Sequence, residues 1–311
     1  LKIVLLYLKS MKKQNNFFWK EIQRKLGKFY FKMIKEFVKN ILFNLKKNKS
    51  TFSPVFIIGC GRSGTTILGN TLSNHPKIKY LNERRDLWNK AYPEFNIWNK
   101  NTQNPKLYAD KKDVISKKNN LLHHLFFREQ VLGNSIILLE KLPINNFRLE
   151  FLNASFPDAK YIYLTRNGLE VSKSIEKRIQ KRNWFGGEKY ELLKKYSSDN
   201  NILFKTKINS DKEKGMWEWK LSIEESNRFF RKENKGNFIH LSYQDFIDSP
   251  SKKIKDILDF LKLDYTENWI NKTSENIKRK NPETKKTEDK SLYLIGGDIL
   301  NKTIDNSYTP Y

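Results

Sequence analysis

A glycine-rich loop between an apolar run and a helical pattern is the segment best suited to bind an anion. Residues 55–58 predict a short buried strand, and apolar residues recur at helical spacing from Ile67 onward. Between these elements, Gly59, Gly61 and Gly64 let the backbone turn tightly and approach a ligand closely. Because the amides at a helix N-terminus are unpaired and the helix dipole attracts negative charge, the segment predicts a phosphate- or sulfate-binding loop.

The loop differs from a Walker A loop in the position of its positive charge. Gly59 and Gly64 have Walker A spacing, but Thr65 stands where that loop has the lysine that reaches the β- and γ-phosphates. Arg62 instead places a cation within the loop. We therefore expect a short anion with two charged groups rather than a nucleoside triphosphate with its magnesium.

Three charged residues that suit the same chemistry, Glu83, Lys141 and Arg166, closely follow apolar runs that predict strands. An arginine together with a hydroxyl, here Ser174 in the next predicted helix, suits a terminal phosphate. Each residue also has a simpler interpretation when it is taken alone. A charge cluster such as residues 83–86 is usually solvated, and a lysine at a strand end usually extends to water.

The elements that position these residues alternate between strands and helices. Strands are predicted near residues 55–58, 78–81, 136–139, 161–164 and 238–241, with helices at 145–156, 169–175, 217–229 and 254–261. This pattern predicts one α/β domain, P-loop-like, over residues 51–311, with a central parallel sheet of about five strands and helices on both faces. The candidate residues then share the edge at which such sheets bind ligands. Residues 86–130 are expected to form an irregular lid or acceptor-binding structure with some helix, and residues 180–212 are polar with a turn at 185–187. Residues 272–290 are expected to form a loop, and 295–297 the start of a short closing element.

Residues 1–50 form a basic extension in which Glu21 and Glu36 are the only acids. Aromatic and aliphatic residues recur every three or four positions from Phe17 to Phe37, which predicts an amphipathic helix. One interpretation is a helix packed on the domain, and the other is a peripheral contact with an anionic membrane.

Composition limits the partners and the compartment. The formal charge of +26 favours an anionic partner, and the single cysteine excludes an intramolecular disulfide. With only four histidines the chain offers no zinc ligand set, so we expect no metal. Neither a membrane-spanning run nor a secretory cleavage pattern is present, so we expect a cytoplasmic protein, or one peripheral to the membrane.

Two motifs resemble those of the sulfotransferases that use 3′-phosphoadenosine-5′-phosphosulfate (PAPS). The segment Gly61-Arg62-Ser63-Gly64-Thr65-Thr66 is similar to their 5′-phosphosulfate loop, and Arg166 with Ser174 is similar to their 3′-phosphate motif. The family usually has proline where Gly168 stands, which should loosen that loop. The resemblance covers roughly residues 52–265 and implies transfer of a sulfuryl group from PAPS to an acceptor hydroxyl.

The resemblance also implies roles for individual residues. Glu83 is similar to the catalytic base of tyrosylprotein and glycan sulfotransferases, and Lys141 to the lysine that stabilises the oxygen between phosphate and sulfuryl group. Arg62 would share that charge. Taken by themselves, Tyr243 and Trp219 are candidates to stack on the adenine, although an isolated aromatic residue more often belongs to the core. We expect the acceptor to be a glycan or lipid-linked saccharide, while protein tyrosine and small alcohols stay open.

Two other functions remain as alternatives. A P-loop kinase or NTPase would bind ATP with magnesium, and a basic module would bind membrane or nucleic acid through residues 1–50. Nucleic acid is not expected as a partner of the sulfotransferase.

Overall fold

The computed structural model describes residues 16–46, 52, 54–200, 202, 208–232, 235–275, 277 and 289–310. The chain divides into two compact units, Leu1–Ser50 and Thr51–Tyr311. The structure of residues 1–15 and of 278–288, most of the expected 272–290 loop, lies outside the described residues.

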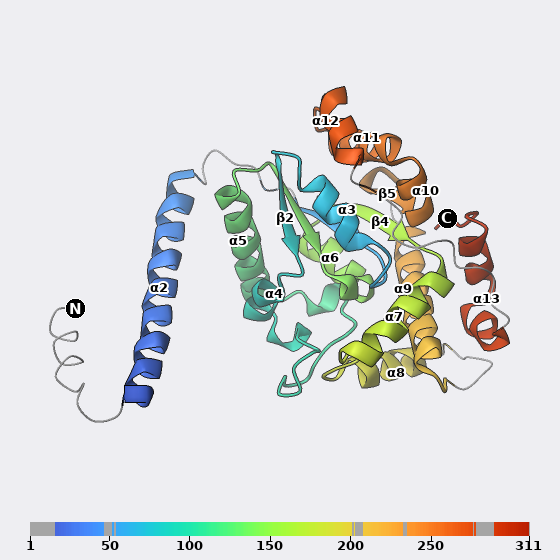
Figure 1. Ribbon diagram of the computed structural model, residues 1–311, viewed down its shortest axis with the longest axis horizontal. Coiled ribbons are helices and arrows are strands. Elements are labelled where there is room, and N and C mark those ends of the chain that lie inside the picture. Colours follow the sequence, from blue (N-terminus) through green and yellow to red (C-terminus); the bar gives the residue numbers. More distant parts are fainter. Residues whose placement is uncertain are drawn as a thin grey trace. The chain divides into compact units, whose positions relative to one another are not determined.

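A five-stranded sheet lies at the centre of the second unit (Figure 1). Its strands run in the order β2-β3-β1-β4-β5, and every neighbouring pair is parallel. They span β1 Pro54–Ile58, β2 Ile78–Asn82, β3 Ile137–Lys141, β4 Lys160–Thr165 and β5 Phe238–Ser242. The predicted fold class is confirmed, because contiguous apolar runs are typical of parallel strands buried on both faces.

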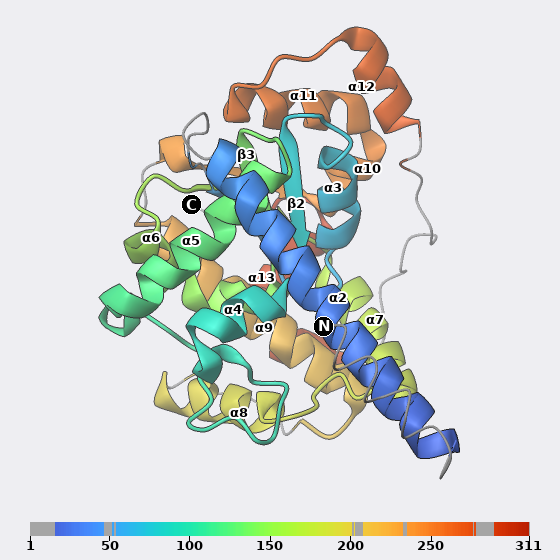
Figure 2. The ribbon, with the colours of Figure 1, turned by 90° about the vertical axis from the view of Figure 1, so that its left-hand side faces the viewer.

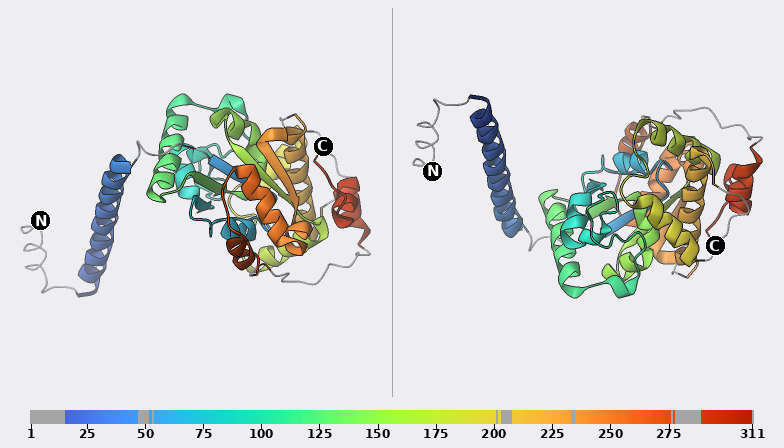
Figure 3. Two further views of the ribbon diagram at one scale, coloured as in Figure 1. Left: turned by 90° about the horizontal axis from the view of Figure 1, so that it is seen from above. Right: turned by 90° about the horizontal axis from the view of Figure 1, so that it is seen from below.

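The two faces of the sheet build two separate cores. Along β1, Phe56 and Ile58 pack into one core, whereas Val55 and Ile57 pack into the other, as the alternation of side chains along a strand requires. Figure 2 and Figure 3 show the helical layers on the two sides. The first core is covered by α4 Arg85–Ala91, α5 Ser116–Leu132, α6 Leu149–Ser155, α7 Gly168–Lys181, α8 Lys189–Asp199, α9 Asp211–Phe230 and α13 Lys290–Ile304. The second is covered by α3 Thr65–Leu72, α10 Tyr243–Asp248, α11 Pro250–Leu261 and α12 Glu267–Ser274.

The polar segments contain more helix than the sequence predicted. Residues 86–130 hold α4 and most of α5, and residues 180–212 hold α8. Both α5 and α8 are rich in polar residues, so their apolar spacing is weak, and a few buried side chains such as Phe126 and Leu193 fix them. The segment after 290 is also longer than expected, since it forms all of α13.

The helix expected over residues 145–156 is divided into two. A 3₁₀ segment, η4 Pro143–Arg148, precedes α6, and Arg148 at the junction is not in a helical conformation. The α-helical part therefore begins at Leu149 rather than at Asn145.

The first unit contains one long described helix, α2 Asn16–Lys46. Its aromatic and aliphatic side chains are largely exposed, with Phe37 at 66% and Ile34 at 61%. A search for a span of bilayer length and hydropathy found none in the described helices.

Candidate active site

The glycine loop joins β1 to α3 in a strained, left-handed backbone. Arg62 has φ +77° and Gly64 has φ +95°, so the loop turns where a side chain is normally disfavoured. A Cβ atom on Gly59 would lie 2.5 Å from the Leu164 carbonyl oxygen, which explains why only glycine fits there. Gly64 precedes α3 without a capping side chain, and the Ser63 hydroxyl is buried without a hydrogen-bond partner among the described atoms. The amides of this helix end and the Ser63 hydroxyl therefore remain available to an anion.

Parallel pairing of β2 with β3 brings Glu83 and Lys141 together. The register places Asn82 opposite Lys141, and the Glu83 amide donates to the Lys141 carbonyl oxygen at 2.9 Å. The Lys141 ammonium lies 2.6 Å from Glu83 Oε1 and 3.0 Å from Thr66 Oγ1. The Lys141 side chain is 1% exposed, so it points into the site rather than extending to water as an isolated lysine usually does.

The Glu83 carboxylate is held in its charged form by two cations. Arg85 Nη2 donates to Glu83 Oε2 at 3.1 Å, opposite the contact with Lys141. Burial alone would raise the pKa of Glu83, but the hydrogen bonds and charges of Lys141 and Arg85 outweigh it and lower this pKa. Glu83 is therefore deprotonated at neutral pH and accessible, with 36% of its side chain exposed.

The two predicted anion sites adjoin one another. Arg62 Nε donates to Ser174 Oγ at 3.0 Å, and Arg166 Nη1 donates to the Arg62 carbonyl oxygen at 3.2 Å. Burial and the nearby positive charges of Arg178 and Arg166 lower the pKa of Arg62. The loop thus carries a concentration of positive charge that a bound anion would relieve.

Arg166 is itself held by partners that sequence analysis did not identify. Its Nε pairs with Glu170 at 2.7 Å, one helical turn further on, and its guanidinium lies 4.2 Å from the centre of the Tyr243 ring. A Cβ atom on Gly64 would also meet Tyr243, so this ring is wedged between the loop and Arg166. Stacking of Tyr243 on adenine stays a prediction, and the observed contacts give the ring a positioning role. The i,i+4 spacing of Arg166 and Glu170 is a signal that could have identified the pair.

Gly168 lies where its loop enters α7 and is closely packed, and whether it loosens the loop stays a prediction. Asn167 caps α7 by accepting from the Leu169 amide at 2.9 Å. A side chain on Gly168 would collide with Leu300 and Trp219, so close packing accounts for the glycine.

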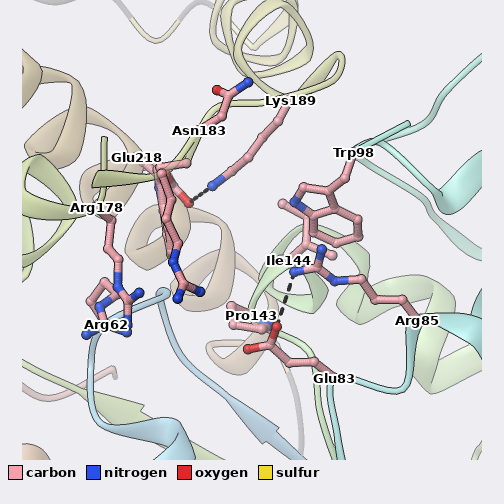
Figure 4. A pocket seen from close by; sticks show the side chains of 12 residues that line it. Arg62, Glu83, Arg85, Trp98, Pro143, Ile144, Arg178, Asn183, Lys189 and Glu218 are labelled. Carbon is pink, nitrogen blue, oxygen red and sulfur yellow. Dashed lines mark hydrogen bonds and ion pairs between the residues drawn. The ribbon is translucent and has the colours of Figure 1, made fainter. Parts of the chain in front are cut away.

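A cavity of about 390 Å³ opens beside Glu83 and Arg62 (Figure 4). Sequence analysis did not single out most of its other lining residues, among them Arg85, Trp98, Arg178, Arg182 and Trp184. Trp98, Arg182 and Trp184 come from polar segments of weak periodicity, whereas Arg178 lies on the amphipathic helix α7, and only the fold brings them together.

Trp184 closes the cavity over the glycine loop. A Cβ atom on Gly61 would lie 2.8 Å from its ring, and Trp184 Nε1 donates to Glu218 Oε2 at 2.6 Å. Lys189 pairs with the other Glu218 oxygen, also at 2.6 Å. Beneath the loop, Cys60 is buried, and this burial raises the pKa of its thiol.

The structure brings the predicted site residues to one edge of the sheet. The loop residues, Glu83, Lys141, Arg166, Ser174 and Tyr243 form one connected set through the contacts described above. His75, in contrast, is structural, because its Nε2 lies 3.0 Å from the Asp264 carbonyl oxygen. A search of the described residues for clusters of metal ligands found none.

The residues present fit PAPS. A nucleotide with anionic groups at its 5′ and 3′ positions needs two cationic sites within reach of one adenosine. The unpartnered Ser63 hydroxyl and the uncapped end of α3 suit the 5′ group, and Arg166 lies within hydrogen-bond distance of the same loop.

Comparison with known proteins identifies the family. The model of the sulfotransferase family matches residues 54–267. Comparison with curated protein sequences found no match.

Among solved structures, the sulfotransferase domain of the Synechococcus PCC 7002 olefin synthase is 16% identical, with a TM-score of 0.48 over 80% of this chain and 95% of that one. The sulfotransferase domain of the curacin biosynthetic pathway is 17% identical, with a TM-score of 0.48 over 71% and 77% of the two chains. A sulfotransferase from Mycobacterium avium is 13% identical, with a TM-score of 0.47 over 87% and 80%.

A parallel α/β sheet with an anion-binding loop at its edge defines a nucleotide-binding enzyme of the P-loop-like class. The match over residues 54–267 shows that the chain belongs to the sulfotransferase family, and it is a PAPS-dependent sulfotransferase. The kinase alternative is thereby set aside.

Proposed function

We propose that the enzyme transfers the sulfuryl group of PAPS to a hydroxyl group of a glycan or lipid-linked saccharide. The observation that carries this proposal is the arrangement of Glu83, Lys141 and Thr66 beside the glycine loop. It combines a carboxylate base, a buried cation and an anion cradle within one site. The adjoining cavity supports a saccharide acceptor, because its walls combine tryptophan rings with polar side chains.

Different residues act on the acceptor hydroxyl and on the phosphate groups of the cosubstrate. PAPS supplies the sulfuryl group: an S–O bond forms to the acceptor oxygen while the S–O bond to the 5′-phosphate breaks. Glu83 accepts the proton of the acceptor hydroxyl. Lys141, Arg62 and the loop amides stabilise the negative charge that develops on the departing phosphate oxygen. Arg166 and Ser174 bind the 3′-phosphate.

The 3′-phosphate assignment is tested by calorimetry with two nucleotides. Arg166→Ala should weaken binding of 3′-phosphoadenosine-5′-phosphate (PAP) about tenfold to a hundredfold, because a charge-assisted hydrogen bond is worth about 1.5–3 kcal/mol. Binding of adenosine 5′-phosphosulfate, which lacks a 3′-phosphate, should change much less. Arg231→Gln, at an exposed arginine at the end of α9, is the matched control. Equal losses for both nucleotides would contradict the assignment.

We also propose that the enzyme acts in the cytoplasm against the inner face of an anionic membrane. Support comes from α2, on which exposed apolar residues such as Phe29 and Phe37 share one helix with many lysines. Such a helix buries its apolar face at the lipid boundary while its cations contact anionic headgroups. A lipid-linked acceptor would be presented at the same surface.

A further inference from the structure

Two arginines on the wall of the cavity that belong to neither nucleotide motif have no carboxylate partner among the residues that the structure describes. Arg178 and Arg182 lie one turn apart at the C-terminal end of α7, and both line the cavity that contains Glu83. Within the part of the chain that the structure describes, no ion pair involves either residue. Two other cations of the wall are paired, Arg85 with Glu83 and Lys189 with Glu218, whereas Arg62 is hydrogen-bonded to the Ser174 hydroxyl.

This arrangement is electrostatically unfavourable without a ligand. Arg178 lies in the last turn of α7, and Arg182, which directly follows the helix, donates its amide to the Arg178 carbonyl oxygen, so two like charges lie near each other and repel. Arg62 adds a third positive charge, and burial together with the charges of Arg178 and Arg166 lowers its pKa. Figure 4 shows Arg62 and Arg178 on one side of the cavity and Glu83 with Arg85 on the opposite side. An anion between these walls would reach the arginines without contacting the carboxylate base.

The cosubstrate does not account for these two arginines. Arg166 and Ser174, the residues assigned to the 3′-phosphate, do not line the cavity. The 5′ end already has the loop amides, Arg62 and Lys141. Arg178 and Arg182 therefore face the acceptor side of Glu83.

We infer that the acceptor is an anionic saccharide, and that Arg178 and Arg182 bind a carboxylate, phosphate or sulfate group that it carries beside the reacting hydroxyl. This inference rests on the proposed function and specifies its acceptor. Arginine forms bidentate pairs with such groups, and two arginines would fix the sugar with its hydroxyl toward Glu83. The cavity of about 390 Å³ suits one or two sugar units, and Trp98 supplies an apolar surface at its opposite wall.

The test measures sulfuryl transfer from labelled PAPS to matched acceptors. The panel contains glucuronate polysaccharides, the same polysaccharides after reduction of their carboxyl groups, sugar phosphates, neutral dextran and an acidic tyrosine peptide. Wild type should sulfate the anionic saccharides at least about tenfold faster than their neutral forms, since a charge-assisted hydrogen bond is worth about 1.5–3 kcal/mol and 1.4 kcal/mol is tenfold. Comparison of the uronate with the sugar phosphate identifies the anionic group.

The double variant Arg178→Gln/Arg182→Gln should lose about a hundredfold in kcat/KM for the anionic acceptor and become indifferent to its charge. Its control is Lys177→Gln/Lys181→Gln, which removes the same charge from exposed neighbours that do not line the cavity. The control should retain the wild-type preference. Calorimetry with PAP, expected to be within twofold of wild type for both variants, shows that each is folded.

Other results would overturn the inference in distinguishable ways. Equal rates with neutral and anionic saccharides would contradict it and leave the proposed function intact. Loss of PAP affinity in the arginine variant would assign Arg178 and Arg182 to the cosubstrate. Transfer to the acidic peptide alone, or no transfer to any saccharide despite normal PAP binding, would contradict the saccharide acceptor itself.

Discussion

At the scale of single residues, Glu83 and Lys141 form the contact from which the proposed chemistry follows. Each lies at the end of its own strand, and their side chains meet at 2.6 Å. Glu83 also has an unusual backbone, with φ +50°, so its position is enforced by the surrounding fold rather than by local preference.

Replacing the carboxylate of Glu83 should lower turnover without changing the affinity for the nucleotide. Glu83→Gln should lower kcat about 10²–10⁴-fold, because an amide cannot accept the acceptor proton. PAP affinity should be nearly unchanged. Asp86→Asn is the control, since Asp86 pairs with Arg84 and does not line the cavity. A variant with near-normal turnover in the transfer assay would remove Glu83 from the mechanism.

The pH dependence of activity should reflect the lowered pKa of Glu83. Because Lys141 and Arg85 favour the carboxylate, Glu83 remains deprotonated as the pH falls to its ordinary pKa of 4.5 and loses its charge only below that value. In wild type, kcat/KM measured between pH 5 and 8 should show no loss attributable to this base. A fall in kcat/KM with a midpoint near pH 6 that disappears in Glu83→Gln would contradict the assignment.

Glu140, the residue before Lys141, should make stability depend on pH. It accepts hydrogen bonds from Trp88 Nε1 at 2.9 Å and Asn145 Nδ2 at 3.1 Å, yet burial raises its pKa from 4.5 to about 7. A raised pKa means that the folded state prefers the protonated form. The contribution of Glu140 to the free energy of unfolding is therefore fully present below about pH 4.5 and is lost as the pH rises through 7.

The expected measurement is urea unfolding of wild type and Glu140→Gln at pH 5 and pH 8. Relative to the variant, wild type should lose on the order of 3 kcal/mol of unfolding free energy between these values. Glu275→Gln, an exposed carboxylate, should track wild type. If the difference in unfolding free energy between wild type and Glu140→Gln were the same at pH 5 and pH 8, Glu140 would keep one protonation state over this range.

At the scale of elements, strand register creates the site. The segment between β2 and β3 holds α4 and α5, and the parallel pairing of the two strands aligns Glu83 with Lys141. All five strands could be predicted: β1, β3 and β4 contain apolar runs buried on both faces, and the edge strands β2 and β5, although only partly buried, still have short, largely apolar sequences. The glycine loop could be predicted for the same reason, since its position follows from β1.

The sequence predicted acceptor-binding structure only as a segment, residues 86–130, and not the individual residues that line the cavity. Trp98 and Trp184 lie in polar segments, and no periodicity assigns them to a cavity. Arg148 shows why: it looks like a surface cation but is buried, and it donates to the carbonyl oxygens of Phe95, Lys106 and Leu107. Because these contacts join residues far apart in the sequence, no local sequence pattern predicts that Arg148 is buried.

Arg148 should therefore anchor the segment that carries Trp98. Arg148→Gln removes most of these hydrogen bonds from buried carbonyls, and we expect a loss of about 3 kcal/mol or more in unfolding free energy. Urea unfolding measures it, with Arg231→Gln as the exposed control. If stability were unchanged, the Trp98 segment would have to be held by its other contacts.

At the scale of the whole molecule, the formal charge of +26 should direct the enzyme to anionic surfaces. Ile34→Ser/Phe37→Ser on α2 should reduce binding to vesicles that contain anionic phosphatidylglycerol, because each exposed apolar side chain contributes to insertion. Co-sedimentation measures this, and PAP affinity should not change. Thr303→Ser on α13 is the control. Equal binding of wild type to neutral phosphatidylcholine vesicles would contradict the charge contribution.

The burial of Cys60 determines which side chains of the enzyme an oxidant can reach. Peroxide reacts with thiolates and with accessible thioethers, and the only thiol of the chain is sealed beneath the nucleotide loop in its protonated state. Met216 is equally shielded, whereas Met33 on α2 is 53% exposed. Of the two methionines that the structure describes, Met33 on the basic extension would therefore be oxidised to the sulfoxide first, while Cys60 and Met216 stay protected by burial.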